Sequence, residues 1–511
     1  MTRKKSLLFL LLFSLSLIFT AEKIYSAVKN KPLIMVHYMP WFQTPSFSGY
    51  WGWHWTMNHF NPNSINQSGH REIASHYYPL TGPYDSQDKD ILEYQVLLMK
   101  ISGIDGVLVD WYGNENYYDY GIINTSTNAI FNYIQKAKLS FAIVYEDQTI
   151  KNMISGGHIN YNDAINYGRN AINYLQNTWF KTESYLKIDN RPVLLNFGPQ
   201  YFMNSSDWIS LFSGLTVVPL FFTEDNILSP AGVGAFPWPP MWKSNSNGIL
   251  TQTDLNDYLN QFYQKSNSWN YKIGSTFPGF NDIYKDAGGS SYGYLDSQNG
   301  ITFNSTLQLA LNNNPDIIQL VTWNDYGEGT NIEPTLEYGY QYLEKIQETR
   351  KTFIDSTFDS RKENLLLPIR IYQLRKKYPV DTEINAVLNR AFDLIVSDDL
   401  DNATILIDSL AAVTDVQLNS SDKPYSFLLE QNYPNPFNPS TKIQFSIPSS
   451  GNVSLKIYDI LGRQVSTVIN KYMNPGNYFV EYISKDLPSG IFIYQLECAS
   501  FIQTRKMILL K

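Results

Sequence analysis

The 511-residue sequence has very few of the residues that stabilise a fold covalently or through metal. It contains one cysteine, Cys498, and six histidines. A single cysteine cannot form an internal disulfide, so stability must come from the hydrophobic core. Four histidines, His54, His59, His70 and His76, follow no zinc-ligand spacing. We therefore predict no metal site and no cofactor.

Charge and nucleotide-binding motifs are also scarce. Charged residues make up 17% of the chain, and the net charge is −8. Because binding to nucleic acid needs a clustered basic surface, nucleic acid is not predicted as a partner. The sequence also lacks a phosphate-binding glycine loop, a dinucleotide fingerprint and a Gly-x-Ser-x-Gly elbow. Chemistry based on nucleotides or on a serine nucleophile is therefore not indicated.

Long hydrophobic runs are absent after the first 27 residues. Residues 2–5 are basic in part, residues 7–19 are apolar, and small residues follow at 20–21 and 26–27. This order predicts a signal peptide over residues 1–27. A membrane anchor is the alternative, but the apolar run is short of the about 20 residues of a membrane-spanning helix. We expect an exported protein with no membrane span after signal removal.

The chain is rich in aromatic residues and long enough for two or three domains. It has 37 Tyr and 11 Trp. Such residues suit stacking on sugar rings, and they equally suit an ordinary tyrosine-rich core. Composition alone does not separate these two interpretations.

From residue 31 to 330, short apolar segments alternate with amphipathic ones. The segments expected as strands are 33–38, 106–112, 140–147, 192–197, 217–225, 233–238, 273–279 and the stretch from 317. Helical spacing recurs in residues 90–101, 128–137 and 164–175. Eight strands alternating with helices predict a (β/α)8 TIM barrel of the α/β class over residues 28–346.

Polar and aromatic residues recur where these strands end. They are His37-Tyr38, Asp110-Trp111-Tyr112, Glu146-Asp147 and the residues from Trp323 and Asn324 to Glu328. Because a barrel carries its chemistry at the carboxyl ends of its strands, we expect these side chains to meet at one rim. A salt bridge at the rim is the alternative role for Asp110 and for Glu146. We expect Glu146 to hold substrate hydroxyls.

The last expected strand continues into two acids, Asp325 and Glu328, flanked by Gly327 and Gly329. Carboxylates three residues apart in a turn or helical step point to the same side. Cleavage of a glycosidic bond needs one acid and one base or nucleophile, and two carboxyls in one cleft differ in proton affinity. We predict that Asp325 and Glu328 are the catalytic pair; a solvated acidic turn is the alternative.

A long loop, residues 39–85, follows the first strand and carries Trp41, Trp51, Trp53 and Trp55. The last three alternate as they would in a strand, so they are candidates for sugar stacking or for half-buried core positions. Beyond the barrel, residues 347–420 have helical spacing and predict a helical connector. Residues 421–511 alternate with period two between turn signals, which predicts a small β-sandwich containing Cys498 at a buried strand position.

Several motifs resemble glycoside hydrolase family 99 and its relatives. They are residues 37–42 (HYMPWF), 51–55 (WGWHW), 74–79 (ASHYYP), 103–107 with 111–112, and 323–334 (WNDYGEGTNIEP). The resemblance implies a (β/α)8 barrel that cleaves internal α-mannosidic bonds with retention and without a metal. It also implies substrate contacts from the motif residues His37, Tyr38, Trp41, Asp110, Trp111, Tyr112, Trp323 and Asn324.

The same resemblance assigns roles to the acids. Glu328 matches the family's general acid/base, and Asp325 stands where the family has a Glu that acts on the sugar 2-hydroxyl. Glu146 is similar in position to a family glutamate that contacts the sugar. The Trp-Asn-Asp-x-Gly-Glu pattern also resembles glycoside hydrolase family 71, the α-1,3-glucanases. An α-1,3-glucanase and a non-catalytic surface glycan-binding protein are therefore the alternatives to an α-mannan hydrolase.

The C-terminal residues resemble the type A sorting domain of the type IX secretion system of Bacteroidetes-like bacteria. The matching segments are 432–439 (NYPNPFNP), 458–463 (YDILGR) and 487–492 (LPSGIF). Together with the signal peptide, this implies export across the inner and outer membranes, to the cell surface or the medium. The expected partners are a polysaccharide or glycan substrate and the secretion machinery.

Overall fold

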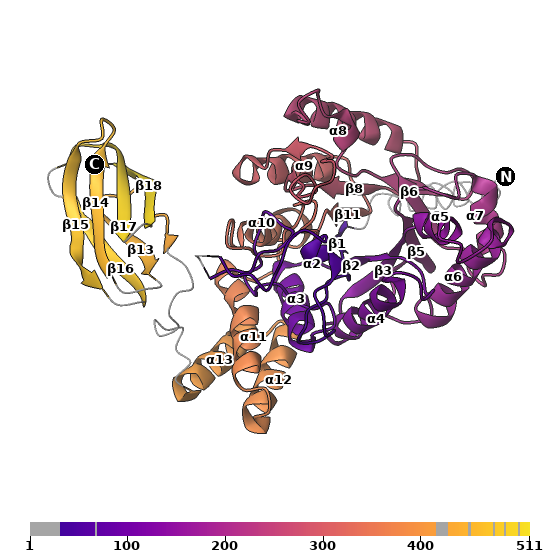
Figure 1. The fold of residues 1–511 in the computed structure, drawn as a ribbon, viewed down its shortest axis with the longest axis horizontal. Coiled ribbons are helices and arrows are strands. Elements are labelled where there is room, and N and C mark those ends of the chain that lie inside the picture. The colour runs from indigo at the N-terminus through magenta and orange to yellow at the C-terminus, as the bar shows by residue number, and fades with distance from the viewer. Residues whose placement is uncertain are drawn as a thin grey trace, which may run out of the picture. The chain divides into compact units, whose positions relative to one another are not determined.

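The computed structural model describes residues 31–66, 69–414, 428–447, 451–473, 476–484, 487–498 and 501–510. The predicted signal peptide lies outside the described residues. The chain divides into two compact units. Figure 1 colours the chain by residue number, from indigo at the N-terminus to yellow at the C-terminus. The first unit comprises residues up to 54 together with 75–369, and the second comprises residues 55–74 together with 370–511.

Eight parallel strands form the centre of the first unit, in the order β7-β6-β5-β3-β2-β1-β11-β8. They are β1 (Leu33–Tyr38), β2 (Gly106–Trp111), β3 (Ser140–Tyr145), β5 (Arg191–Asn196), β6 (Leu220–Glu224), β7 (Gly234–Phe236), β8 (Ile273–Thr276) and β11 (Ile317–Leu320). A short β4 (Lys187–Ile188) pairs antiparallel with β5. Because the last strand lies beside the first, this order is that of a (β/α)8 barrel. The predicted fold class is confirmed.

The expected strands coincide with the observed ones to within three residues at their starts. The two segments interrupted by Gly and Pro gave the short strands β7 and β8, since such residues end a strand early. In the ladder between β1 and β11, Leu33 faces Ile317 and Val36 faces Leu320. The two strands therefore end together, which brings His37 close to the start of the acidic loop.

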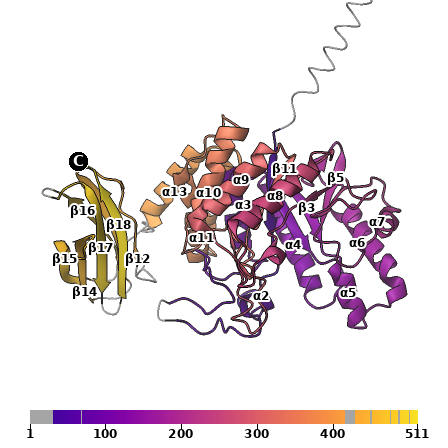
Figure 2. The same ribbon diagram turned by 90° about the horizontal axis from the view of Figure 1, so that it is seen from above.

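Helices cover the outside of the strands, as Figures 1 and 2 show. They are α3 (Lys89–Ser102), α4 (Tyr120–Lys136), α5 (Gln148–Ser155), α6 (Ala164–Thr178), α7 (Ser205–Phe212), α8 (Gln252–Ser266), α9 (Ile301–Asn312) and α10 (Gln341–Thr349). Local sequence fixes the ends of α3, because the Asp88 side chain accepts from the Asp90 N–H and Gly103 adopts a left-handed conformation with φ +80°.

The alternating tryptophans of the long loop do not form a strand. Residues Trp53–Thr56 instead form a single helical turn, α2. Trp55 is fully buried while Trp53 is 47% exposed, so the two rings differ because of a turn and not because of a pleat. The strand prediction for this stretch is wrong. In a strand, residues two apart share one face, whereas in a helical turn they lie on nearly opposite faces, so the difference in exposure between Trp53 and Trp55 fits the turn.

The second unit contains helices followed by two antiparallel sheets. The helices of the connector region include α11 (Leu367–Lys377), α12 (Thr382–Val396) and α13 (Leu400–Thr414). One sheet has the order β12-β13-β16 and the other β15-β14-β17-β18. The strands are β12 (Leu428–Leu429), β13 (Ser440–Ile447), β14 (Gly451–Asp459), β15 (Gln464–Met473), β16 (Gly476–Ile483), β17 (Gly490–Cys498) and β18 (Phe501–Leu509). One face of each sheet contributes to a common core in which Cys498 is 1% exposed, as predicted.

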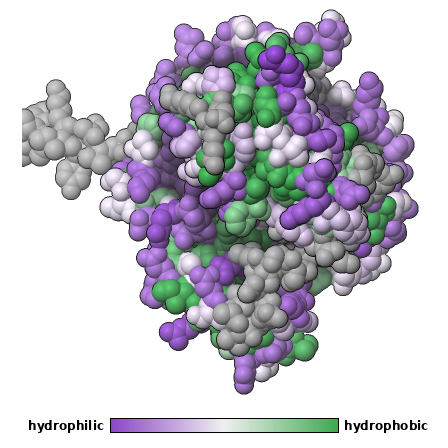
Figure 3. Space-filling view, turned by 90° about the vertical axis from the view of Figure 1, so that its left-hand side faces the viewer, coloured by the Kyte–Doolittle hydropathy of each residue, from purple (hydrophilic) through white to green (hydrophobic). Residues whose placement is uncertain are grey.

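The surface view in Figure 3 shows hydrophilic and hydrophobic side chains interspersed on the face it presents. Among the residues with described structure, no helix has both the length and the apolar content to cross a membrane.

Candidate functional site

The loop after β11 is closed on itself by hydrogen bonds. The Thr322 N–H donates to the Thr330 carbonyl at 2.8 Å, and the Ile332 N–H donates to the Thr322 carbonyl at 2.9 Å. Inside this loop the Asp325 N–H donates to Thr322 Oγ1, and the Glu328 N–H donates to Asp325 Oδ1, each at 2.9 Å. The two acids therefore belong to one rigid turn at the carboxyl end of the barrel, where the sequence placed them.

A second segment holds Glu328 from the side. The Asn281 N–H donates to the Glu328 carbonyl at 2.9 Å, and the Ile283 N–H donates to the Gly327 carbonyl at 3.0 Å. Gly329 has φ +64°, and a Cβ atom there would lie 2.6 Å from the Asn281 carbonyl oxygen. Only glycine fits this position, because of both the backbone conformation and the close approach. The glycine next to Glu328 is thus a packing requirement of the loop.

A buried carboxylate, Glu333, anchors the far end of the loop. It accepts hydrogen bonds from Tyr84 Oη at 2.7 Å, Gln95 Nε2 at 2.8 Å and Tyr326 Oη at 2.9 Å. Burial raises its pKa to about 7, while the donated hydrogen bonds act in the opposite direction. Because Tyr326 follows Asp325 directly, Glu333 fixes the acidic turn from inside the protein.

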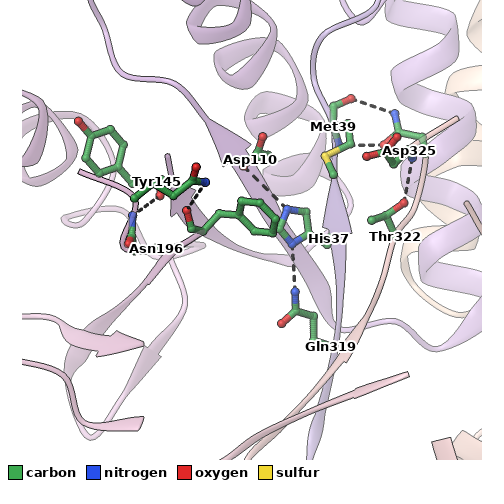
Figure 4. A network of polar contacts seen from close by, with 11 residues as sticks. His37, Met39, Asp110, Tyr145, Asn196, Gln319, Thr322 and Asp325 are labelled. Carbon is green, nitrogen blue, oxygen red and sulfur yellow. Dashed lines mark hydrogen bonds and ion pairs between the residues drawn. The ribbon is translucent and has the colours of Figure 1, made fainter. Parts of the chain in front are cut away.

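His37 lies between Gln319 and Asp110, as Figure 4 shows. Its Nδ1 is 3.0 Å from Gln319 Nε2, and its Nε2 is 4.0 Å from Asp110 Oδ1. Its ring meets the edge of Trp238 at a centroid distance of 4.9 Å. Burial lowers the pKa of His37 to about 3, so the ring is neutral at physiological pH. It supplies hydrogen bonds to the site but no positive charge.

Glu146 and Asp147 follow β3 and have different surroundings. Glu146 is half-buried at the rim, whereas Asp147 is fully buried. Asp147 accepts from the backbone N–H groups of Gln200 at 2.9 Å, Tyr201 at 2.8 Å and Phe202 at 2.7 Å. Asp147 therefore fixes the loop after β5, which leaves Glu146 as the acid available to a ligand.

Five carboxyl groups gather at this rim, and all have raised pKa values. Burial raises the pKa of Asp325 to about 6, of Glu224 to about 7 and of Glu146 to about 8. Burial, and then the nearby Asp325, raises the pKa of Glu328 well above its usual range. Burial and the neighbouring Glu146 do the same for Asp110. Carboxyl groups that are buried close together lose their protons at different pH values. Acid/base catalysis needs such a difference between its acid and its base.

Two of the predicted aromatic residues lie beside this rim. Trp41 stacks on His54 with centroids 4.1 Å apart and planes 6° apart, and its ring lies 6.2 Å from that of Tyr112. Tyr112 is half-buried, whereas 8% of Trp41 is exposed. With one face covered by His54, the Trp41 indole can offer a ligand only its other face or its edge.

Four of the residues predicted to contact substrate are buried and make hydrogen bonds within the protein. Tyr38, Trp111, Trp323 and Asn324 are fully buried. The Tyr38 hydroxyl donates to Gln95 Oε1 at 2.8 Å, Trp111 Nε1 donates to Asn124 Oδ1 at 3.0 Å, and the Asn324 amide pairs with the Met39 backbone. These contacts favour a role in holding the rim in place, and direct contact with a sugar stays a prediction.

Three residues near the acids were not among the predicted site residues. Glu224 ends β6, Tyr284 lies near Glu328 and Asp325, and Glu333 closes the acidic loop. An acid at the end of a predicted strand is the signal that marked Glu146, so the same signal could have found Glu224. No local sequence pattern predicts Tyr284 as a site residue, because it follows a short strand that is not one of the eight barrel strands.

A comparison with known protein families identifies the family to which the barrel belongs. Residues 30–363 match the family described as glycosyl hydrolase family 99. This match covers more than half of the chain, which therefore belongs to glycosyl hydrolase family 99, a class of glycoside-cleaving enzymes.

Similar proteins include the glycoprotein endo-alpha-1,2-mannosidase of Mus musculus, 25% identical over 325 residues, which cover 58% of this chain and 66% of the mouse protein. The glycoprotein endo-alpha-1,2-mannosidase-like protein of Danio rerio is 23% identical over 59% of this chain and 70% of its own length. The matched region thus spans about two thirds of these relatives. A solved structure of the GH99 endo-alpha-mannosidase from Bacteroides thetaiotaomicron aligns with a TM-score of 0.49 and 18% identity, covering 64% of this chain and 98% of the other.

A second family covers the end of the chain. Residues 431–510 match the secretion system C-terminal sorting domain. The β-sandwich is therefore a type IX sorting domain, which directs the protein to the cell surface or the medium.

The role of Asp147 can be tested by its effect on stability. Asp147→Ala removes the acceptor for three backbone N–H groups, so we expect the free energy of unfolding to fall by about 3 kcal/mol. Urea unfolding followed by tryptophan fluorescence measures this change. The exposed Asp359→Ala is the matched control and should leave unfolding nearly unchanged. Equal effects of the two substitutions would contradict the role assigned to Asp147.

The carboxyl cluster predicts a stability that falls as pH rises. The pKa of Glu146 is about 8 in the folded state and 4.5 in a free side chain, and that of Asp325 is about 6 against 3.8. Between these values the folded state binds more protons than the unfolded state, so raising the pH favours unfolding. Each pKa unit is worth about 1.4 kcal/mol. The melting temperature should fall from pH 5 to pH 8, and Glu146→Gln should flatten this slope. An unchanged slope in the variant would refute the assignment.

Proposed function

We propose that this protein cleaves internal α-glycosidic bonds of an α-mannan-like polysaccharide, with Glu328 and Asp325 as the catalytic pair. The observation that carries the proposal is the closed turn after β11, in which Asp325 Oδ1 accepts the Glu328 N–H at 2.9 Å. This contact fixes the Asp325 carboxylate against the backbone of Glu328, so the two acids belong to one turn. Membership of glycosyl hydrolase family 99 and the likeness to the mouse endo-alpha-1,2-mannosidase support the choice of an α-mannoside.

The proton affinities of the pair suit their two roles. Glu328 keeps its proton to higher pH because of burial and the nearby Asp325 charge, so it serves as the general acid that protonates the leaving oxygen. Asp325 has the lower pKa of about 6 and is held there partly by backbone N–H groups, so it is ionised near neutral pH and serves as a base. The surroundings of the two carboxyl groups therefore suit Glu328 to the role of acid and Asp325 to the role of base.

The reaction then proceeds in two steps. Asp325 takes the proton of the sugar 2-hydroxyl while O2 attacks C1, the bond from C1 to the leaving oxygen breaks, and Glu328 gives that oxygen its proton. The product of this step is a 1,2-anhydro sugar. Water next attacks C1 while the bond from C1 to O2 breaks, Glu328 takes a proton from the water, and the released O2 recovers its proton from Asp325. Two inversions at C1 give net retention.

The remaining rim residues would bind the sugar. Glu146, which is half-buried, would accept sugar hydroxyls, and the buried Asp110 would hold Glu146 in place through a side-chain hydrogen bond. His37 lies beside Asp110. Trp41 and Tyr112 provide aromatic surface beside them. Within the chain, residues 28–346 would carry the chemistry, residues 347–420 the connection, and residues 421–511 the contact with the secretion machinery.

One departure from the family motif favours a second candidate. The family resemblance places Glu where this chain has Asp325, and the Trp-Asn-Asp-x-Gly-Glu pattern is that of α-1,3-glucanases. An α-1,3-glucan is therefore the alternative substrate, cleaved by the same carboxyl pair. A glycan-binding protein without turnover is the third candidate, since the shorter Asp side chain changes the reach to the 2-hydroxyl.

Incubation with α-mannan and with α-1,3-glucan tests these candidates directly. We expect oligosaccharide release from α-mannan, and Glu328→Gln should lower the rate by about 10²–10⁴-fold because it removes the general acid. Glu183→Gln, an exposed acid outside the site, is the matched control. Release that survives Glu328→Gln would refute the assignment of the acid. Release from α-1,3-glucan alone would select the second candidate, and binding without release the third.

The pH profile of this activity follows from the two carboxyl groups. The rate should rise as the pH passes about 6, because Asp325 must lose its proton to act as base. It should fall at higher pH, where Glu328 loses the proton that it donates. Initial rates on α-mannan between pH 4 and pH 9 give the profile. A rate that is highest below pH 5 would show that Asp325 does not act as the base.

A further inference from the structure

A cavity adjoins the loop that carries Glu328. Its volume is about 220 Å³, enough for on the order of seven water molecules. Gly329, the residue after Glu328, forms part of its wall. Glu337 and Asn299 at its border are exposed, so the cavity can be reached from solvent. Its size suits one sugar ring.

Three tyrosines form the apolar part of this wall. The rings of Tyr77 and Tyr338 lie 5.5 Å apart, and those of Tyr338 and Tyr342 lie 4.9 Å apart. Tyrosine rings present flat apolar surface with a polar hydroxyl at one end, which suits the C–H face of a pyranose. This row is separate from the Trp41 and Tyr112 surface in the catalytic cleft.

The cavity also contains a buried acceptor that lacks a partner. Asn331 is 1% exposed and lines the cavity. Its Nδ2 is hydrogen-bonded to the Tyr338 hydroxyl, which fixes the orientation of the amide. Its Oδ1 has no hydrogen-bond partner among the described residues. Buried polar atoms are normally paired, so Asn331 brings an unused acceptor to the wall of the cavity, where a sugar hydroxyl is a suitable donor.

The charge of the wall narrows the ligand class. Of the described residues that line this cavity, none is Lys or Arg, and Glu337 brings a carboxylate to its border. An anionic ligand is therefore disfavoured, while a neutral polyol can donate hydroxyl hydrogens to Asn331 and Glu337. A second cavity of about 430 Å³ shares Asn299, Gln341 and Tyr342 with the first, so a ligand longer than one ring has room to continue.

We propose that this cavity, lined by Tyr77, Asn331, Tyr338 and Tyr342, is an additional subsite that binds a neutral side-branch sugar of the polysaccharide. This proposal rests on the proposed function, because Gly329 ties the cavity to the loop that would act on the main chain. A main-chain sugar over Glu328 then has its branch held in the cavity that adjoins the loop. The enzyme prefers branched over linear substrate for this reason.

Calorimetry on the full chain with Glu328→Gln tests the subsite without turnover. The two probes are a linear α-mannan oligosaccharide and the same oligosaccharide with a single mannosyl branch. We expect the branched probe to bind about 10-fold more tightly. Adding Gln341→Trp, which fills the cavity, should reduce the affinity for the branched probe to that for the linear one. Gln308→Trp, an exposed glutamine on α9 outside both cavities, is the matched control and should keep the difference.

A second filling variant, Ser297→Trp, comes from another wall and should give the same loss, so misfolding of one variant does not decide the result. Equal binding of the two probes, binding of neither probe, or a difference that survives both fillings would overturn the subsite. Hydrolysis of the linear probe by the chain with native Glu328 tests the proposed function separately. Hydrolysis without a preference for the branched probe rejects the subsite alone.

Discussion

The hydrogen bond from the Glu328 N–H to the Asp325 carboxylate is the contact on which the candidate site depends. It joins two acids that would otherwise repel each other, and it does so through the backbone, so both side chains keep oxygens for a ligand. Thr322 supports the same turn by accepting the Asp325 N–H. The register of β11 against β1 then sets the height of this turn above the barrel. The pairing of these two strands therefore determines where the two carboxyl groups lie.

The surrounding protein is built to keep this turn in one conformation. Glu333 accepts three side-chain hydrogen bonds inside the core, and Gly329 allows residues 281–283 to run against the backbone of the loop. Buried carboxyl groups lower stability at neutral pH, because they hold protons that the unfolded chain has released. The same burial separates the pKa values of Asp325 and Glu328. The site therefore lowers the stability of the fold at neutral pH, and the same burial gives two neighbouring acids different proton affinities.

The position of a residue along its strand explains which way its side chain points. Successive side chains of a strand point to opposite faces. His37 and Asp110 point into the barrel, whereas Tyr38 and Trp111 point outward, to Gln95 and to Asn124. The alternation could have been read from the sequence, since each pair is adjacent. The family resemblance predicted the same role for both residues of each pair, because adjacent residues belong to the same motif. A motif does not tell which of its residues contact a ligand and which hold those residues in place.

The sequence by itself determined the eight strands, the acids at their ends and the alternating strands of the sorting domain, because these depend on local hydrophobic periodicity and on turn residues. It also determined that Asp325 and Glu328 share one turn, since they are three residues apart. Only the tertiary structure decided that Asp147 is structural while Glu146 faces the cleft, and that Glu224 and Tyr284 approach the pair. It also placed the three-tyrosine cavity beside Gly329. These features join residues far apart in the chain, and their geometry is fixed by packing, which no local pattern records.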